Sequence, residues 1–160
     1  MSNTLQIVPQ GDQEIVFTRN FNAPRTKVWR ALTEPELLKQ WLGSFGDWTM
    51  PLCEVDLKVG GKYRYQWRNG ANGTTMGMGG KFLEISAPER LVATELFDDP
   101  WYPGEAIDTQ VLTEKGGKTT LTLTVQYASK EARDSVMEGP ATSGLEHNYG
   151  NLERLLDTLA

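Results

Sequence analysis

Three large aromatic residues, Tyr63, Tyr65 and Trp67, alternate with polar residues over segment 62–68. A period of two places all three rings on one face of a β-strand and the polar side chains on the other. The aromatic face either fills a protein core completely or lines an apolar cavity, and the alternation fits both. The chemistry that such a face suits is the binding of an apolar molecule.

Other residue types that suit an apolar site lie near this segment. Met76 and Met78 share one face of the next expected strand, and Trp48, Trp101 and Tyr102 flank the ends of segments. Flexible thioethers and aromatic rings in loops fit adaptable binding sites. The same residues also serve as ordinary gap fillers or as a lid over a hydrophobic edge. Both interpretations stay open at this level.

One acidic residue, Glu95, lies in the middle of an expected strand between apolar neighbours. A glutamate at such a position either points to solvent or acts as the polar anchor of a pocket. In a pocket it is the best candidate for general acid-base catalysis. No residue is predicted to be catalytic on the present pattern.

Nucleophilic and metal-dependent mechanisms find little support. His147 is the only histidine and Cys53 the only cysteine, so we expect neither a transition-metal site nor a disulfide, and no cofactor. On a helix, His147 lies opposite Leu145 and Tyr149 and should face water. Cys53 lies in a strand pattern, away from the helix starts that activate thiols.

Length and charge bound the class of protein. The chain has 160 residues and a net charge of -5, with basic residues scattered along it. Scattered Lys and Arg disfavour nucleic acid as a partner. The N-terminus lacks a secretion-signal pattern, and no segment approaches the ~20 apolar residues that a membrane helix needs. We therefore expect a cytoplasmic protein, with a flexible tail over 1–12 and one domain over 13–160.

The elements that position these residues follow from their periodicity. A strand from Gln13 ends at Pro24, a short helix follows, and Thr33 with Glu36 predicts a capping box that starts a second short helix. Six strand segments come next, separated by turn-forming residues, at 50–57, 61–69, 76–86, 89–98, 106–114 and 118–127. Their short connections indicate antiparallel pairing.

After Ser129 the pattern becomes helical, with an interruption at Gly139-Pro140. The last helix carries an apolar stripe of Leu145, Tyr149, Leu152, Leu156 and Leu159. We predict an α+β fold in which a curved antiparallel sheet of about six to seven strands wraps around this long C-terminal helix.

The order of several residues is similar to a known family. The residues that carry the likeness are Ala23-Pro24, Val28-Trp29, Ala31, Thr33, Pro35, Trp41, Asp56, Gly60-Gly61, Tyr63, Gly80-Lys81-Phe82, Glu84, Pro88, Arg90, Thr120-Leu121-Thr122, Gly144, Tyr149, Leu152 and Leu156. The chain resembles the family similar to the activator of heat-shock protein 90 ATPase, in its single-domain bacterial form. The resemblance implies a helix-grip fold of the START/Bet v 1-like type, with a hydrophobic cavity between sheet and long helix.

The resemblance supplies no catalytic residues and leaves several functions open. The family's usual tryptophan after the last-helix glycine is Leu145 here, which would reshape a cavity below it. The first expectation is a protein that binds a small, mostly apolar molecule such as a lipid or a polycyclic aromatic compound. The alternatives are a module that stimulates a chaperone ATPase and a cyclase or hydrolase that uses a pocket Glu or Tyr. Ligand identity and oligomeric state stay open. The predicted binding residues are Trp48, Tyr63, Tyr65, Trp67, Met76, Met78, Glu95, Trp101, Leu145 and Tyr149.

Overall fold

The computed structural model describes residues 3–43, 46–100 and 102–159. Their helices and strands follow in the order β1 (Gln6–Gln10), β2 (Glu14–Phe21), α1 (Arg25–Thr33), α2 (Pro35–Trp41), β3 (Trp48–Val55), β4 (Lys62–Asn69), β5 (Thr75–Ser86), β6 (Arg90–Phe97), β7 (Ala106–Lys115), β8 (Lys118–Gln126), α3 (Lys130–Glu138) and α4 (Ala141–Leu156). The strands of this part of the chain form one antiparallel sheet in the order β1-β2-β8-β7-β6-β5-β4-β3.

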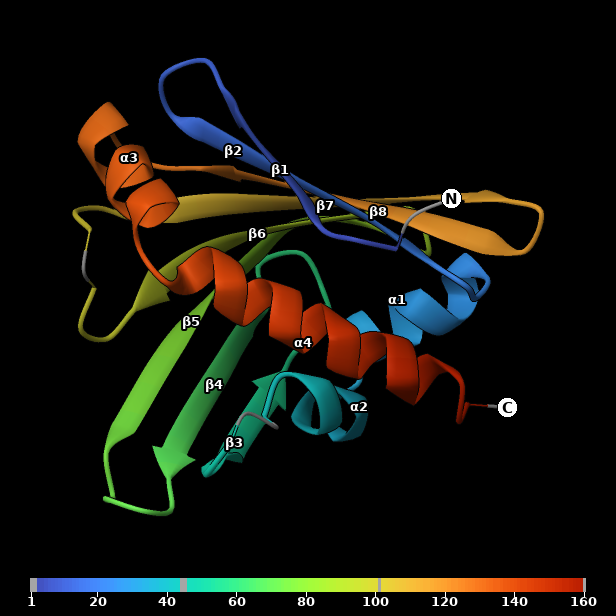
Figure 1. Ribbon diagram of the computed structural model, residues 1–160, viewed down its shortest axis with the longest axis horizontal. Coiled ribbons are helices and arrows are strands. Elements are labelled where there is room, and N and C mark those ends of the chain that lie inside the picture. Colours follow the sequence, from blue (N-terminus) through green and yellow to red (C-terminus); the bar gives the residue numbers. More distant parts are fainter. Residues whose placement is uncertain (1–2, 44–45, 101, 160) are drawn as a thin grey trace.

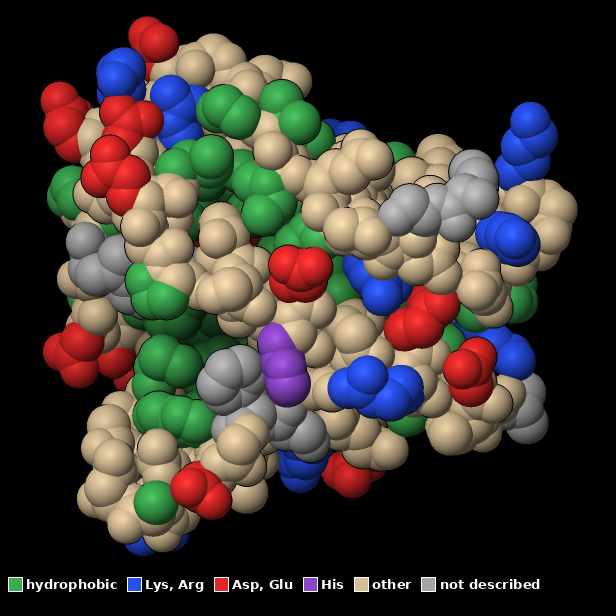
Figure 2. Space-filling model, viewed as in Figure 1, with side chains coloured by type: hydrophobic (Ala, Val, Ile, Leu, Met, Phe, Trp, Pro, Cys, Tyr) green, Lys and Arg blue, Asp and Glu red, His purple; other side chains and the backbone are tan. Residues whose placement is uncertain are grey.

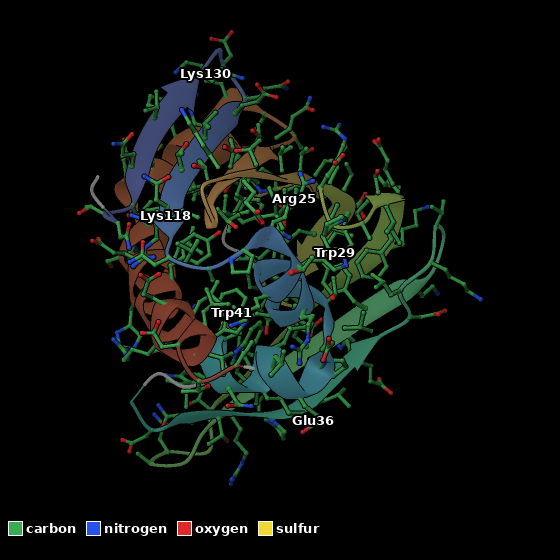
Figure 3. All side chains as sticks on the ribbon, turned by 90° about the vertical axis from the view of Figure 1, so that its right-hand side faces the viewer. Arg25, Trp29, Glu36, Trp41, Lys118 and Lys130 are labelled. Carbon is green, nitrogen blue, oxygen red and sulfur yellow. The ribbon has the colours of Figure 1, made fainter. Side chains whose placement is uncertain are left out.

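The sheet curves around helix α4, which runs across it (Figure 1). Helices α1 and α2 lie beside the C-terminal half of α4 and close one end of the fold. Trp41 of α2 lies between α2 and α4 (Figure 3), where its ring centroid is 6.0 Å from that of Tyr149. Phe21 at the end of β2 meets the same tyrosine edge to face at 5.7 Å. These contacts hold α4 over the sheet.

The α+β class and the antiparallel sheet around a C-terminal helix are confirmed, and the arrangement is consistent with a helix grip. The strand count of six to seven was wrong, because the structure has an eight-stranded sheet. The additional strand is β1, which lies within the segment expected to be a flexible tail and pairs with β2. Most residues of β1 are exposed because it lies at the sheet edge, so it lacks the alternation of apolar residues that marks β2.

The junction between the first two helices differs from the predicted capping box. Thr33 belongs to the last turn of α1, and its hydroxyl donates to the carbonyl of Trp29 at 2.8 Å. Helix α2 begins at Pro35 with Glu34 as its N-cap, and no side chain caps it. A residue before proline is driven toward extended backbone, and Glu34 has φ -89 and ψ 122. Pro35, and not a capping Thr33, therefore sets the start of α2.

The C-terminal region follows its predicted pattern. The side chain of Ser129 caps α3 by accepting a hydrogen bond from the amide of Ala132. The helical structure is interrupted at Gly139 and Pro140, which separate α3 from α4. Tyr149, Leu152 and Leu156 are buried on one face of α4, as the stripe predicted. His147 is exposed on another face, also as predicted.

Candidate functional site

A cavity of about 420 Å³ lies between the first half of α4 and the sheet. Figure 2 shows hydrophobic side chains gathered in a hollow beside this part of the helix. We call this space the outer chamber. It is lined by Phe17, Leu42, Trp48, Trp67, Met76, Met78, Glu95, Phe97, Tyr102, Leu123, Val125, Tyr127, Val136, Gly144, Leu145 and Asn148.

A smaller cavity of about 150 Å³, the inner chamber, lies deeper between α2, α4 and the sheet. The two chambers are adjacent, because both are lined by Leu42, Trp67, Met78, Glu95, Leu123 and Leu145. The inner chamber is also lined by Leu32, Leu38, Trp41, Tyr63, Tyr65, Phe82, Leu91, Ala93, Asp108, Gln110 and Tyr149. The aromatic alternation of segment 62–68 thus borders open space as well as core.

The structure brings the described members of the predicted set together. Trp48, Trp67, Met76, Met78, Glu95 and Leu145 line the outer chamber, and Tyr63, Tyr65 and Tyr149 line the inner one. Trp101 lies outside the described residues. These residues line two adjacent chambers, and their role in binding a ligand stays a prediction.

The aromatic wall of β4 is held by hydrogen bonds to the backbone. The hydroxyl of Tyr63 donates to the carbonyl of Thr94 at 2.6 Å, and Nε1 of Trp67 donates to the carbonyl of Leu42 at 3.0 Å. A β carbon on Gly80 would overlap the same Thr94 carbonyl, so glycine is needed where β5 passes β6 this closely. The Tyr65 ring lies between its two aromatic neighbours, 5.0 Å from Tyr63 and 5.9 Å from Trp67. These contacts fix the wall before any ligand enters.

Two carboxyl groups meet where the chambers join. Glu95 on β6 and Asp108 on β7 line the inner chamber, and each side chain shifts the pKa of the other. The Tyr102 hydroxyl donates to Oε2 of Glu95 at 3.2 Å. Two carboxyl groups can share a hydrogen bond only when one of them holds a proton. When it holds a single proton, the pair combines an acid with a base.

Burial controls the protonation of this pair. Loss of hydration raises the pKa of Glu95, although hydrogen bonds from Asp108 and Tyr102 oppose the rise. Burial raises the pKa of Asp108 well above its ordinary value, and the nearby charge of Glu95 adds to this rise. No Lys, Arg or His is among the described residues that line either chamber. The pair thus lacks a cation that would favour its full ionisation.

The sequence reasoning missed Asp108. The signal was available, because Ala106, Asp108, Gln110 and Leu112 alternate on one face of β7. Ala106 and Leu112 are buried, which places the aspartate in phase with core residues. An acidic residue in phase with the core indicates a functional or paired carboxyl.

No group of three or more His, Cys, Asp or Glu side chains in the described part of the chain is arranged to hold a metal ion. None of the helices described has the length and apolar character needed to span a lipid bilayer.

The comparisons with known proteins agree on one family and one fold. The family model described as "Activator of Hsp90 ATPase homolog 1-like protein" matches residues 22–157. No curated protein matches the chain. A protein from Rhodobacter sphaeroides of known crystal structure is 35% identical, with a TM-score of 0.91 and coverage of 98% of this chain and 99% of that one.

Two other solved structures are more distant in sequence. A protein from Chromobacterium violaceum is 28% identical, with a TM-score of 0.78 and coverage of 92% of this chain and 99% of its own. A protein from Nitrosomonas europaea is 27% identical, with a TM-score of 0.79 and coverage of 94% and 98%. The architecture described above is thus shared with other small bacterial proteins.

Proposed function

The chain belongs to the Activator of Hsp90 ATPase homolog 1-like family, and we propose that it binds a small, mostly apolar molecule in the cavity between the sheet and α4. The observation that carries the proposal is the outer chamber itself, which is walled by aromatic, Met and aliphatic side chains and has few polar groups. Pockets for small molecules have this composition, and a volume of about 420 Å³ lies within their usual range.

The shape of the cavity points to the class of ligand. The larger outer chamber is mostly apolar, and the smaller inner chamber beside it is lined by Glu95 and Asp108. This arrangement fits a molecule with a broad apolar body and one polar end, such as a fused-ring compound or a lipid. Transfer of the apolar body from water supplies roughly 25 cal/mol for each Å² that is buried.

Leu145 is the residue that best tests the proposal, because it borders both chambers. The family resemblance led us to expect tryptophan at this position, so Leu145→Trp fills space with a residue that the fold accommodates in relatives. The matched control is Leu145→Met, which conserves volume and flexibility. The neutral fluorescent probe N-phenyl-1-naphthylamine reports on apolar sites.

We expect the wild-type protein and Leu145→Met to bind the probe with similar affinity. We expect Leu145→Trp to bind about tenfold or more weakly, since about 1.4 kcal/mol of lost contact is sufficient for that change. Native mass spectrometry of gently purified protein complements the assay by detecting a co-purified molecule. Absence of probe binding, or equal binding by Leu145→Trp, would contradict the proposal.

General acid-base catalysis is a second candidate, favoured by the shared proton of Glu95 and Asp108. A protonated carboxyl next to a carboxylate can donate a proton to a substrate and remove one from it. Incubation of any co-purified molecule with fresh protein in D₂O tests this. Deuterium incorporation that is lost in Glu95→Gln would support catalysis, and an unchanged molecule would argue for binding alone.

The family name refers to activation of a chaperone ATPase. We rank that function lower for this chain, because the apolar lining of the outer chamber is suited to a small molecule. The ATPase rate of a purified Hsp90-type chaperone, measured with and without the protein, decides this alternative.

A further inference from the structure

We propose that the polar end of the ligand is a protonated amine, held by Glu95 and Asp108 where the two chambers join. This inference rests on the proposed function and specifies the ligand class more closely: an apolar amine, with an aromatic or alkyl body in the outer chamber.

The first argument is charge. The two carboxyl groups face the cavity from neighbouring strands, while the described lining residues include no cation. Arg19 is the buried cation nearest to this region on β2, and it is already engaged with Glu153 at 3.2 Å and with the Phe21 ring at 4.6 Å. A buried carboxylate without a counter-ion is costly. A positively charged ligand would therefore supply the counter-ion that the described lining residues do not provide.

The second argument is the balance of hydrogen-bond donors and acceptors. Oδ1 of Asp108 and Oδ1 of Asn148 are buried and find no donor among the described residues. Three of the nearby donors have other acceptors, since Tyr63 and Trp67 donate to backbone carbonyls and Tyr102 donates to Glu95. An ammonium group has three donors and no acceptor. An ammonium group can therefore donate to Oδ1 of Asp108, whereas an ionised carboxylate or phosphate ester has no proton to offer this oxygen.

The third argument is the nature of the walls. Tyr65 lines the inner chamber with the carboxyl pair, Trp67 lines both chambers, and Tyr102 and Tyr127 line the outer chamber. Aromatic faces attract cations and also bury hydrocarbon, so they serve both ends of an apolar amine. Carboxylates combined with aromatic walls fit an organic cation better than a neutral lipid.

Protonation gives the inference a distinctive signature. The other ionisable groups that face the pair are Tyr63 and Tyr65 from β4, Tyr102, Tyr127, and Tyr149 from α4, together with Arg19 beyond Tyr149. Burial raises the pKa of each of these tyrosines, so they stay neutral near physiological pH. Only the carboxyl pair then loses a proton when an ammonium group binds. Amine affinity should rise as pH rises through the pKa of the pair, and proton release should accompany binding.

Three naphthalene compounds with one ring system and different polar ends test the inference: 2-naphthylmethylamine, 2-naphthylmethanol and 2-naphthoate. Isothermal titration calorimetry in two buffers of different ionisation enthalpy measures affinity and proton release together. We expect the amine to bind at least about tenfold more tightly than the alcohol, with 2-naphthoate weakest. Asp108→Asn and Glu95→Gln should each abolish the preference for the amine while changing the alcohol affinity less than about threefold.

The control is Glu146→Gln, which removes the same charge from the exposed face of α4 and should leave the preference intact. If the alcohol binds and the amine binds no more tightly, the amine inference is wrong and the apolar binding function stands. If none of the three compounds binds, both proposals are wrong. If the preference survives in Asp108→Asn and Glu95→Gln, the carboxyl pair does not recognise the amine.

Discussion

Replacement of Trp67 by phenylalanine tests how the cavity wall is fixed to helix α2. The indole Nε1 of Trp67 donates to the carbonyl of Leu42 at 3.0 Å, and Trp67 is 9% exposed. Leu42 is the C-cap residue of α2, where carbonyl groups have no partner within the helix. The indole of Trp67 thus gives a hydrogen-bond donor to a carbonyl at the C-terminal end of α2. Trp67→Phe keeps an aromatic ring and removes the donor.

The magnitude follows from two losses. An unpaired Leu42 carbonyl costs roughly 1–3 kcal/mol, because the partly buried acceptor no longer has a donor. The smaller ring leaves a void that costs roughly a further 1 kcal/mol. We therefore expect the free energy of unfolding to fall by about 3 kcal/mol. For a domain of this size, that loss corresponds to a decrease in Tm of roughly 6–12 °C.

Equilibrium unfolding in guanidinium chloride, followed by circular dichroism, measures this change. The denaturant dependence should stay the same, so that the shift in midpoint reports stability alone. Trp48→Phe is the matched control, since Trp48 lines the same chamber while half-buried. We expect it to cost less than about 1 kcal/mol. A loss below about 0.5 kcal/mol for Trp67→Phe, or an equal loss in the two variants, would refute the role of the indole bond.

Two further predictions concern ionisable groups. Because burial raises the pKa of Glu95 and Asp108 above their ordinary values of 4.5 and 3.8, the unfolded chain releases these protons first as pH rises. The pair's contribution to stability is therefore complete at low pH and declines from about pH 4 upward until the folded pair also ionises. Urea unfolding over a pH series should show this decline in the wild type relative to Asp108→Asn; parallel curves would contradict it. Burial also raises the pKa of the Cys53 thiol to about 11, so at pH 8 only about one thiol in a thousand is ionised. Ellman's reagent should react slowly with the native protein and quickly in denaturant, and equal rates would show that Cys53 is accessible.

The local sequence pattern was sufficient to predict many of the strands and helices of this protein. The alternation of Tyr63, Tyr65 and Trp67 predicted one inward face, because successive side chains of any strand point to opposite sides. Gly139-Pro140 predicted the break between α3 and α4, since neither residue continues a helix well. These predictions needed only properties of the backbone within a few residues.

Other features depended on neighbours far away in the chain. Strand β1 forms because β2 offers a free edge, and its own exposed residues give little sign of this pairing. Asp108 meets Glu95 because β6 and β7 pair in a register that places Ala93 opposite Asp108 and Ala106 opposite Glu95. A shift of one residue would turn the aspartate to the other face of the sheet. The candidate site therefore depends on pairing that no single segment encodes.

The sequence by itself determined the kind of face that this protein presents to its interior: aromatic and apolar residues with one visible acidic residue, on a sheet that meets a C-terminal helix. Only the tertiary structure decided that this face borders open space and that a second carboxyl group lines the inner chamber. The physical reason is that alternating aromatic residues form the same strand whether their rings line a cavity or pack in a filled core. The position of α4, held by Trp41 and Phe21 against Tyr149, sets the distance across the fold and so decides between the two.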